Sequence, residues 1–312
     1  MAWVGKFGEQ QVHLIDYRDR ASVLIWVVLM GLAAQRFLDL PARVWETEIF
    51  GSPVNFAITA NTVLGVLLAG LIASGTEAVV RSHPRLLGVS DGGGRAGAAR
   101  DGSPRSAARA RGLRRVRSAA QARWMYWGVP IALIMVAVLL LPLAPTVLYW
   151  ALGLIATGIV LGLSLAGLYY TVDPFQPGYR RARLGMNALT YAIALLLFLV
   201  VYRTRVRSII SATEVLLVSS LLALELLRGS ERPITLVALY AGITGVVLGQ
   251  ATWVLNYWRL DGLTGGLVLL VLFYNVVGLA QHALHGRVRR RILLEYGLIT
   301  IAAMALIWEF AP

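Results

Sequence analysis

The chain has no cysteine, and Lys6 is its only lysine. Without thiols it cannot form a disulfide, a thiolate metal site, an iron–sulfur cluster or a cysteine nucleophile. A retinal Schiff base needs an amine inside the membrane, and Lys6 lies outside every apolar stretch, so that chemistry is excluded too. The formal net charge of +13 therefore comes almost wholly from arginine.

Charged residues are scarce as well, at 14% of the chain against 58% hydrophobic residues, and they lie between the apolar stretches. A hydrocarbon core about 30 Å thick needs roughly 20 apolar residues in a helix. Lipid offers no partner to backbone N–H and C=O groups, so such stretches must be helical. Barrel strands would alternate in polarity instead. We predict an all-α fold, a polytopic transmembrane helix bundle of about nine spans.

The apolar stretches divide the chain into four parts. A polar segment, residues 1–20, lacks the features of a cleaved secretory signal, so the first span is expected to be a retained anchor. Two spans follow in 21–80, then an arginine-rich loop over 81–123, then seven spans in 124–312. A tight turn between Pro142 and Pro145 separates the third and fourth spans, because proline stops a helix. The predicted spans are 21–38, 54–80, 127–143, 146–171, 184–202, 211–227, 234–257, 263–283 and 292–310.

Arginine counts in the loops predict the orientation. Eleven arginines lie between the second and third spans, which predicts a cytoplasmic loop, a cytoplasmic N-terminus and an outer C-terminus. The loop with Arg203, Arg205 and Arg207 falls on the outer face and disagrees with the rule. Placing this loop in the cytoplasm would move the arginines of 287–291 to the outer face, which would violate the rule more strongly. We expect a multi-pass protein of the cytoplasmic (cell inner) membrane.

The arginine-rich loop allows three interpretations. The first is a solvated, flexible segment that only sets the orientation, since glycine, alanine and serine dominate it. The second is contact with anionic lipid headgroups. Contact with nucleic acid is disfavoured, because no aromatic residues interleave with the arginines to stack on bases. The candidate lipid contacts are Arg109, Arg111, Arg114, Arg115 and Arg117.

Ionisable residues avoid the predicted span centres. Glu214 and Glu225 share one face of the sixth span but lie about 16 Å apart along its axis, too far for paired-carboxylate chemistry. Arg228 lies one turn beyond Glu225, so we expect a local ion pair there. The sequence therefore indicates neither a catalytic site nor a cofactor.

Neutral polar residues and one histidine remain as candidates for an intramembrane polar site. Asparagine and glutamine in lipid must find partners, and interhelical hydrogen bonds are the usual outcome. A path for a polar solute or water is the alternative. The candidates are Asn61, Thr244, Gln250, Asn275, Gln281 and His282.

His282 and His285 share a face at the end of the eighth span, and Glu295 follows in the ninth. A four-coordinate metal needs more ligands than this cluster offers, so interfacial hydrogen bonding is the favoured interpretation. Glycine pairs at 158 and 162, and at 245 and 249, have the spacing that lets helix backbones pack closely. We interpret them as helix packing rather than as a dimer contact.

The C-terminal third contains Asn256-Tyr257-Trp258, Gly265-Gly266, Phe273-Tyr274, Gly278-Leu279-Ala280-Gln281-His282 and Leu294-Glu295-Tyr296. Over roughly residues 200–310 this pattern resembles a family of bacterial polytopic membrane proteins classed as a domain of unknown function. The resemblance implies no activity, but it directs attention to the Gln281–His282 end of the eighth span. The arginine-rich loop departs from the family pattern.

Three classes of function fit the sequence. The first is a non-catalytic subunit, scaffold or assembly component of a membrane complex, favoured by the absence of ionisable residues at the span centres. The second is a transporter or channel for a neutral or lipid-like solute, using the polar residues above. The third is an intramembrane enzyme with a His282, His285 and Glu295 site at the cytoplasmic interface. Lipid headgroups and a protein of a membrane complex are the expected partners.

Overall fold

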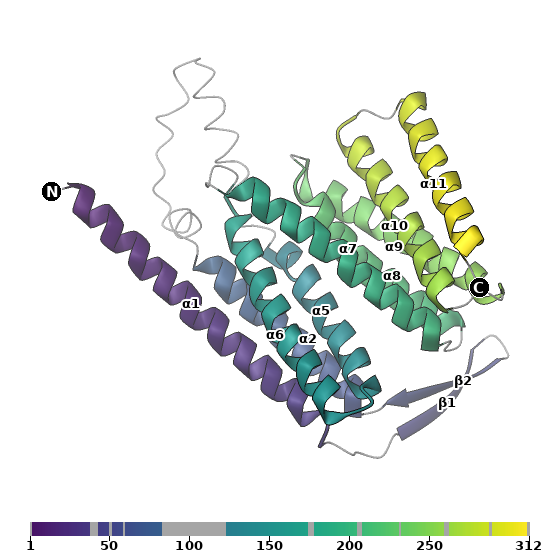
Figure 1. The fold of residues 1–312 in the computed structure, drawn as a ribbon, viewed down its shortest axis with the longest axis horizontal. Coiled ribbons are helices and arrows are strands. Elements are labelled where there is room, and N and C mark those ends of the chain that lie inside the picture. The colour runs from purple at the N-terminus through teal and green to yellow at the C-terminus, as the bar shows by residue number, and fades with distance from the viewer. Residues whose placement is uncertain are drawn as a thin grey trace.

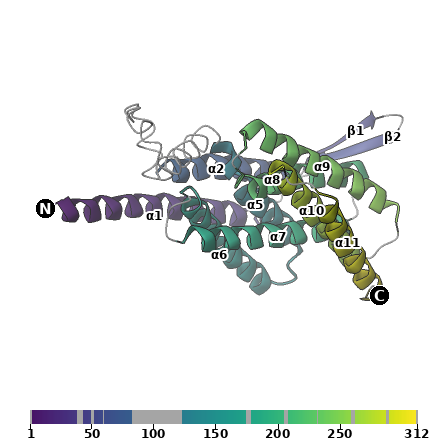
Figure 2. The ribbon, with the colours of Figure 1, turned by 90° about the horizontal axis from the view of Figure 1, so that it is seen from above.

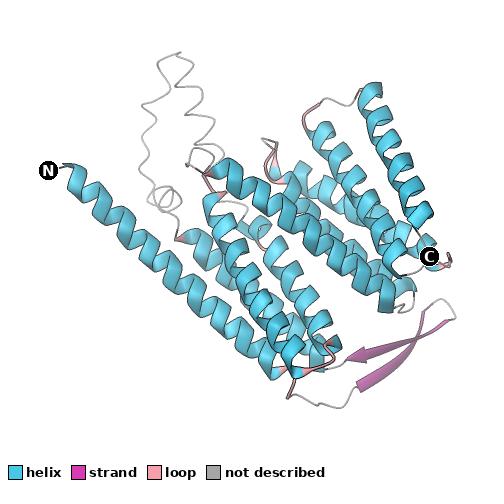
Figure 3. Ribbon diagram, in the orientation of Figure 1, coloured by secondary structure: helices cyan, strands magenta, loops and turns pink. Residues whose placement is uncertain are grey.

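The computed structural model describes residues 2–37, 43–49, 52–58, 60–82, 123–173, 178–204, 208–230, 232–258, 262–286 and 289–310. These residues form nine α-helices, two short 3-10 helices and one two-stranded hairpin (Figures 1 and 3). The protein is thus predominantly helical, as predicted. Six described segments are helical, long and apolar enough to cross a membrane: Asn61–Arg81, Trp124–Leu143, Val147–Tyr170, Tyr179–Arg203, Ile234–Asn256 and Gly262–Leu284.

Each predicted span overlaps a helix, and most boundaries agree within five residues, but the first helix begins 19 residues before its predicted span. The helices are α1 (Ala2–Ala34), α2 (Ala60–Arg81), α5 (Gly128–Leu140), α6 (Val147–Tyr170), α7 (Tyr179–Thr204), α8 (Ser208–Leu227), α9 (Ile234–Asn256), α10 (Gly262–Leu284) and α11 (Arg290–Phe310). At 1.5 Å per residue, the 33 residues of α1 reach about 50 Å, more than a bilayer core requires. Figures 1 and 2 show its N-terminal part projecting beyond the other helices.

The predicted turn between Pro142 and Pro145 is confirmed. A 3-10 turn, η3 (Leu141–Leu143), ends α5, and Ala144 is extended, as expected for a residue before proline. Thr146 then begins α6, and its Oγ1 accepts a hydrogen bond from the Tyr149 N–H at 3.4 Å. Proline chemistry therefore separates two helices within a few residues.

The start of the second predicted span was wrong. Residues 54–58 belong to strand β2 (Ser52–Ile58), which pairs in antiparallel register with β1 (Arg43–Ile49), and α2 begins only at Ala60. The apolar residues Val54, Phe56 and Ile58 recur with the period of a strand, which a count of apolar residues does not detect. Asn55, which we placed in a span, is a strand residue. The hairpin projects beyond the helices where α1 ends and α2 begins (Figure 3).

Side-chain contacts show that the helices alternate in direction. Arg183, near the start of α7, pairs with Glu225 near the end of α8, and Arg232, before α9, donates to the Leu284 carbonyl at the end of α10. We call this end of the bundle the basic end. Its described arginines are Arg18, Arg20, Arg81, Arg123, Arg180, Arg181, Arg183, Arg228, Arg232, Arg289, Arg290 and Arg291.

The other end of the bundle is tied together by neutral hydrogen bonds. Gln35, after α1, donates from Nε2 to the Val138 carbonyl of α5 at 3.0 Å. The Tyr202 hydroxyl of α7 donates to the Leu255 carbonyl of α9, also at 3.0 Å. The described arginines here are only Arg36, Arg43 and Arg203. The two ends therefore differ strongly in charge.

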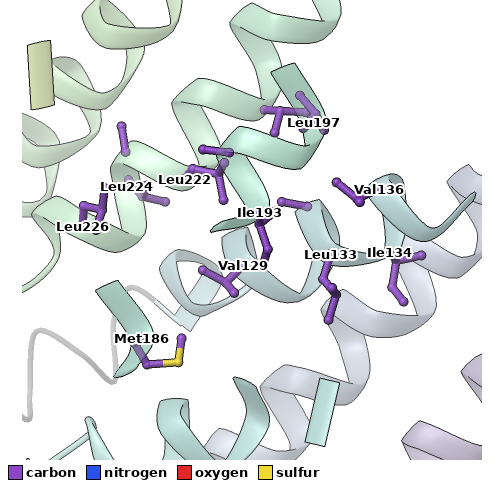
Figure 4. Packing of buried hydrophobic residues seen from close by; sticks show 14 of the residues in the cluster. Val129, Leu133, Ile134, Val136, Met186, Ile193, Leu197, Leu222, Leu224 and Leu226 are labelled. Atoms are coloured by element: carbon purple, nitrogen blue, oxygen red, sulfur yellow. The ribbon is translucent and has the colours of Figure 1, made fainter. Parts of the chain in front are cut away.

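Helix α5 lies at the centre of the bundle, buried on nearly every side, as expected for a helix that is apolar all round. Its side chains form one apolar cluster with those of α7 and α8 (Figure 4). Gly128 allows the closest approach, because a Cβ atom there would lie 2.5 Å from the Leu221 carbonyl oxygen of α8. A larger residue at position 128 would force these helices apart.

The outer helices present apolar faces to their surroundings. Helix α6 exposes Leu148, Leu152, Ile155, Ile159 and Leu163 at helical spacing and buries its opposite side. A soluble protein rarely leaves such a stripe uncovered, whereas lipid covers it at no cost.

The glycine pairs serve packing inside the chain, as predicted. A Cβ at Gly158 or Gly162 would meet Leu29 or Ile25 of α1. At Gly245 and Gly249, a Cβ would meet α8 backbone carbonyl oxygens. Both pairs let two helices of one chain approach closely.

Candidate functional site: a buried Arg–Glu–Arg cluster

Three charged side chains meet inside the bundle at its basic end. Glu225 of α8 is fully buried and lies between Arg183 of α7 and Arg228, which directly follows α8. Arg183 Nη1 donates to Glu225 Oε1 at 3.2 Å, and Arg228 Nε donates to Oε2 at 2.6 Å. Each carboxylate oxygen therefore has its own guanidinium partner. We call these three residues the charged cluster.

Arg183 also completes the end of helix α8. Its Nη2 donates to the carbonyl oxygens of Glu225 at 3.0 Å and Leu226 at 2.9 Å. The last carbonyls of a helix have no partner within it, and a cation nearby is favoured by the helix dipole. One guanidinium thus bonds to a carboxylate and to two carbonyl oxygens at the end of the helix.

Arg228 connects the cluster to two further elements. Its Nη2 donates to Thr171 Oγ1, just after α6, at 2.7 Å. Its guanidinium lies 4.5 Å from the ring centroid of Tyr126 in the short helix η2 (Arg123–Tyr126), a cation–π contact. Burial by itself would lower the pKa of Arg228, but the charge of Glu225, its hydrogen bond to Arg228 and the nearby tyrosines Tyr126 and Tyr179 together outweigh burial and raise the pKa. Arg228 therefore stays charged.

The cluster holds helices together. Both carboxylate oxygens of Glu225 are bonded to guanidinium groups, and those guanidinium groups bond in turn to neighbouring elements. Removing Glu225 would leave two guanidinium groups close together without their counter-ion, which is strongly destabilising. The arrangement joins η2, α6, α7 and α8 at one level of the bundle.

Sequence reasoning found half of this cluster. The local Glu225–Arg228 pair was predicted and is confirmed. In the sequence, Arg183 follows Arg180 and Arg181 closely, and nothing distinguishes it from those two arginines. Those two are exposed, whereas the side chain of Arg183 is 15% exposed. A partner 42 residues away leaves no signal in sequence spacing.

The candidates Thr244 and Asn275 are buried, and both hydrogen bond to their own helices. Thr244 Oγ1 donates to the Tyr240 carbonyl at 2.8 Å, and Asn275 Nδ2 donates to the Val271 carbonyl at 2.6 Å. Asn275 Oδ1 is buried without a hydrogen-bond partner among the described residues, as is Oδ1 of Asn187 on α7. They are two of seven buried side-chain polar atoms without a hydrogen-bond partner in the described part of the chain.

The candidates at the end of α10 also face backbone groups. His282 Nδ1 lies 2.8 Å from the Gly278 carbonyl oxygen, and its ring meets Tyr296 of α11 edge-on at 5.7 Å between centroids. Gln281 Nε2 lies 3.5 Å from the Leu226 carbonyl oxygen, at the limit of a hydrogen bond. His285 Nδ1 lies 2.6 Å from the Gln281 carbonyl oxygen, on the exposed side.

Glu295, the third member of the predicted histidine site, is exposed and pairs with Arg291 at 3.0 Å. Among the residues that the structure describes, no three histidine or acidic side chains are grouped in a way that could hold a metal ion.

The two remaining candidates lie apart from the others. Asn61 is half-buried near the start of α2, and Gln250 is exposed on α9. The arginine candidates of the loop, 109–117, lie outside the described residues. The structure therefore does not bring the predicted polar residues together in one site. It brings together Arg183, Glu225 and Arg228 instead, of which only the Glu225–Arg228 pair was predicted.

These features define a multi-pass helical membrane protein that has a buried ion-pair cluster at its basic end. Within that class, the chain belongs to a family described as proteins of unknown function, DUF5656, which matches residues 40–309. The match confirms the resemblance seen in the C-terminal third and extends it to most of the chain. Helix α1 precedes the matched residues. No curated protein and no solved structure matches the chain.

Proposed function

We propose that the protein is a non-catalytic component of a membrane complex, that is, a subunit, scaffold or assembly factor that carries out no chemical reaction itself. The observation that carries this proposal is the charged cluster. Both carboxylate oxygens of Glu225 are bonded to arginines that also bind a helix end and a neighbouring side chain. Such a network supports a rigid arrangement of helices and leaves neither carboxylate oxygen without a protein partner.

The proposal includes an orientation. The basic end would face the cytoplasm, because arginine accumulates in cytoplasmic loops. Nine crossings would then place the N-terminus inside and the C-terminus outside, in the cytoplasmic membrane. Single cysteines at Arg180 and Trp258 test this, since the chain has no other thiol. An impermeant maleimide added to intact cells should label Trp258→Cys and leave Arg180→Cys unlabelled; the reverse pattern would contradict the orientation.

Anionic lipid headgroups are the proposed partners of the basic end. Arg180, Arg181 and Arg290 are exposed there, and each basic residue near an anionic surface contributes about 1 kcal/mol. The loop arginines 109–117 would add to this contact. Deleting residues 92–118 should weaken the salt-sensitive binding of the purified protein to anionic liposomes, and unchanged binding would remove the loop from this role.

The direct test of the proposed function is mass spectrometry of the protein extracted gently from its native membrane, with an absorption spectrum of the same sample. A protein partner at fixed stoichiometry, absent from a mock purification, is the expected result. A chain that carries only lipid would count against a subunit role.

A second candidate function rests on the buried oxygens without partners. Asn187 Oδ1 and Asn275 Oδ1 could accept hydrogen bonds from a neutral or lipid-like solute passing between helices. A flux assay in proteoliposomes tests this, with Asn275→Leu as the variant and Ile155→Ala on the exposed face of α6 as the control. Flux lost only in Asn275→Leu would favour transport over the scaffold.

A further inference from the structure

Helix α9 exposes a polar side chain in the middle of an apolar face. Gln250 is exposed and has no hydrogen bond to any described residue. Among the asparagines and glutamines whose side chains the structure describes, it is the only exposed one. It lies six residues before the end of α9, about 9 Å along the axis, and thus within the apolar part of the span.

The residues around Gln250 form a regular seam. Leu239, Ile243, Val246, Gln250, Trp253 and Tyr257 follow one another at alternating steps of four and three residues, and all are exposed. This is the heptad spacing by which two helices pack in parallel, with Gln250 at one of the core positions. We call these six residues the α9 seam.

The exposed face of α6 provides a contrast within the same molecule. Its stripe from Leu148 to Leu163 is equally apolar and contains no amide. Figure 2 shows α6 and α9 on opposite sides of the helical body. Lipid alone satisfies the α6 stripe, whereas lipid offers nothing to the donor and acceptor of Gln250.

We propose that the α9 seam binds the α9 seam of a second copy of this chain. The occupant follows from the chemistry and the depth of Gln250. A carboxamide has one donor and one acceptor group, so it is complementary to itself. Two copies inserted in the same orientation carry Gln250 at the same depth, and a two-fold axis along the membrane normal brings these amides together. A polar core residue of this kind fixes register and pairing.

The interface does not rest on the proposed function, because a scaffold and a solute channel could form it alike. Mass spectrometry of the native complex tests the proposed function, whereas cross-linking between copies tests the interface. Either proposal can therefore be refuted without the other.

Cysteine cross-linking in membranes tests the seam, since the chain supplies no background thiol. Val246→Cys lies on the seam, one turn from Gln250. Ile155→Cys on α6 is the matched control, because Val246 is 45% exposed and Ile155 58% exposed. Both lie about 12 to 15 Å along the axis from the helix end opposite the basic end. Copper–phenanthroline should convert Val246→Cys to a disulfide-linked dimer and leave Ile155→Cys monomeric. Equal linking of both would overturn the proposal.

A second substitution tests the amide itself. Adding Gln250→Leu to Val246→Cys should lower the dimerisation constant about three- to thirty-fold, the range expected for losing interhelical hydrogen bonds in a membrane. Gln250→Asn retains an amide and should keep more of the dimer than Gln250→Leu does. Because Gln250 is exposed, neither change disturbs the fold of one chain. Linking that is unaffected by Gln250→Leu would overturn the amide pairing.

Discussion

Glu225 and Gln250 are both polar residues on apolar helices, but their surroundings are opposite. Glu225 is buried, and two arginines and the end of α8 surround it. Gln250 is exposed, with apolar neighbours on the same face. A group that is satisfied internally stabilises one arrangement of helices. A group left open at the surface requires something from outside the chain, which we infer to be a second copy.

The largest expected effect follows from removing the negative charge of the cluster. Glu225→Gln leaves Arg183 and Arg228 close together and uncompensated, so the free energy of unfolding should fall by about 3–5 kcal/mol. Chemical unfolding in detergent micelles measures this. Glu295→Gln is the control, because that carboxylate is exposed and its pair with Arg291 is worth at most about 1 kcal/mol. Equal losses in the two variants would contradict the locking role.

A smaller loss is expected when the charge of Arg183 is kept and its shape is changed. Arg183→Lys retains one cation but cannot reach Glu225 Oε1 and two carbonyl oxygens at once. We expect a loss of about 2 kcal/mol, since hydrogen bonds to charged groups contribute about 1.5–3 kcal/mol each. Arg181→Lys, on the exposed side of the same turn, should change nothing measurable. If Arg183→Lys leaves the unfolding free energy as unchanged as Arg181→Lys does, the hydrogen bonds from Arg183 to the end of α8 contribute nothing measurable to stability.

The packing between α8, which carries Glu225, and α9, which carries Gln250, can be tested with alanine. A Cβ at Gly245 would clash with the Leu216 carbonyl oxygen, whereas a Cβ at Gly242 meets nothing within 4 Å. Gly245→Ala should therefore destabilise the protein by about 1–3 kcal/mol through overpacking. Gly242→Ala should be neutral or stabilising by up to about 1 kcal/mol, because alanine favours the helix. Thermal unfolding should show a clear loss of stability for Gly245→Ala and no loss for Gly242→Ala; equal losses in the two variants would refute the close contact.

Asn275 lies between the two extremes, because its Nδ2 is bonded and its Oδ1 is open. Asn275→Leu removes both groups together, so we expect a change in unfolding free energy within about 1 kcal/mol and of either sign. A loss of several kcal/mol would show that Asn275 makes a structural contact comparable with that of Glu225. The measurement also prepares the flux assay, because the variant must be folded to be informative.

The smallest effect on the single chain is expected at Gln250. Gln250→Leu should leave the unfolding free energy of the monomer within about 0.5 kcal/mol, as for ordinary exposed positions. Its effect should appear only in self-association. A clear loss of monomer stability would show that Gln250 is satisfied within the chain, and the contrast with Glu225 would disappear.

Much of the fold could be predicted from the sequence because its signals are local. Apolar length located the helices, and Pro142 with Pro145 separated α5 from α6. The pair of Glu225 and Arg228 was visible because they are three residues apart on one helix. The hairpin was missed because Val54–Ile58 is short and apolar, so its period of two was hidden in a longer apolar run.

The candidate site was less predictable for a physical reason. Polar residues on an apolar helix can be found by composition, but the face that meets a neighbour depends on how all the helices pack. Thr244 and Asn275 turned inward and Gln250 outward, although the three looked alike in sequence. The same limit concealed which of three neighbouring arginines would reach Glu225.

The sequence by itself determined that this chain forms membrane-crossing helices, where most of them begin and end, and which loops carry the positive charge. Those properties follow from transfer between water and lipid, residue by residue along the chain. Only the tertiary structure decided that Arg183 joins Glu225 across 42 residues and that Gln250 is left open. Helix packing sets these contacts, because glycines such as Gly128 and Gly245 fix which helices approach closely and therefore which faces remain exposed.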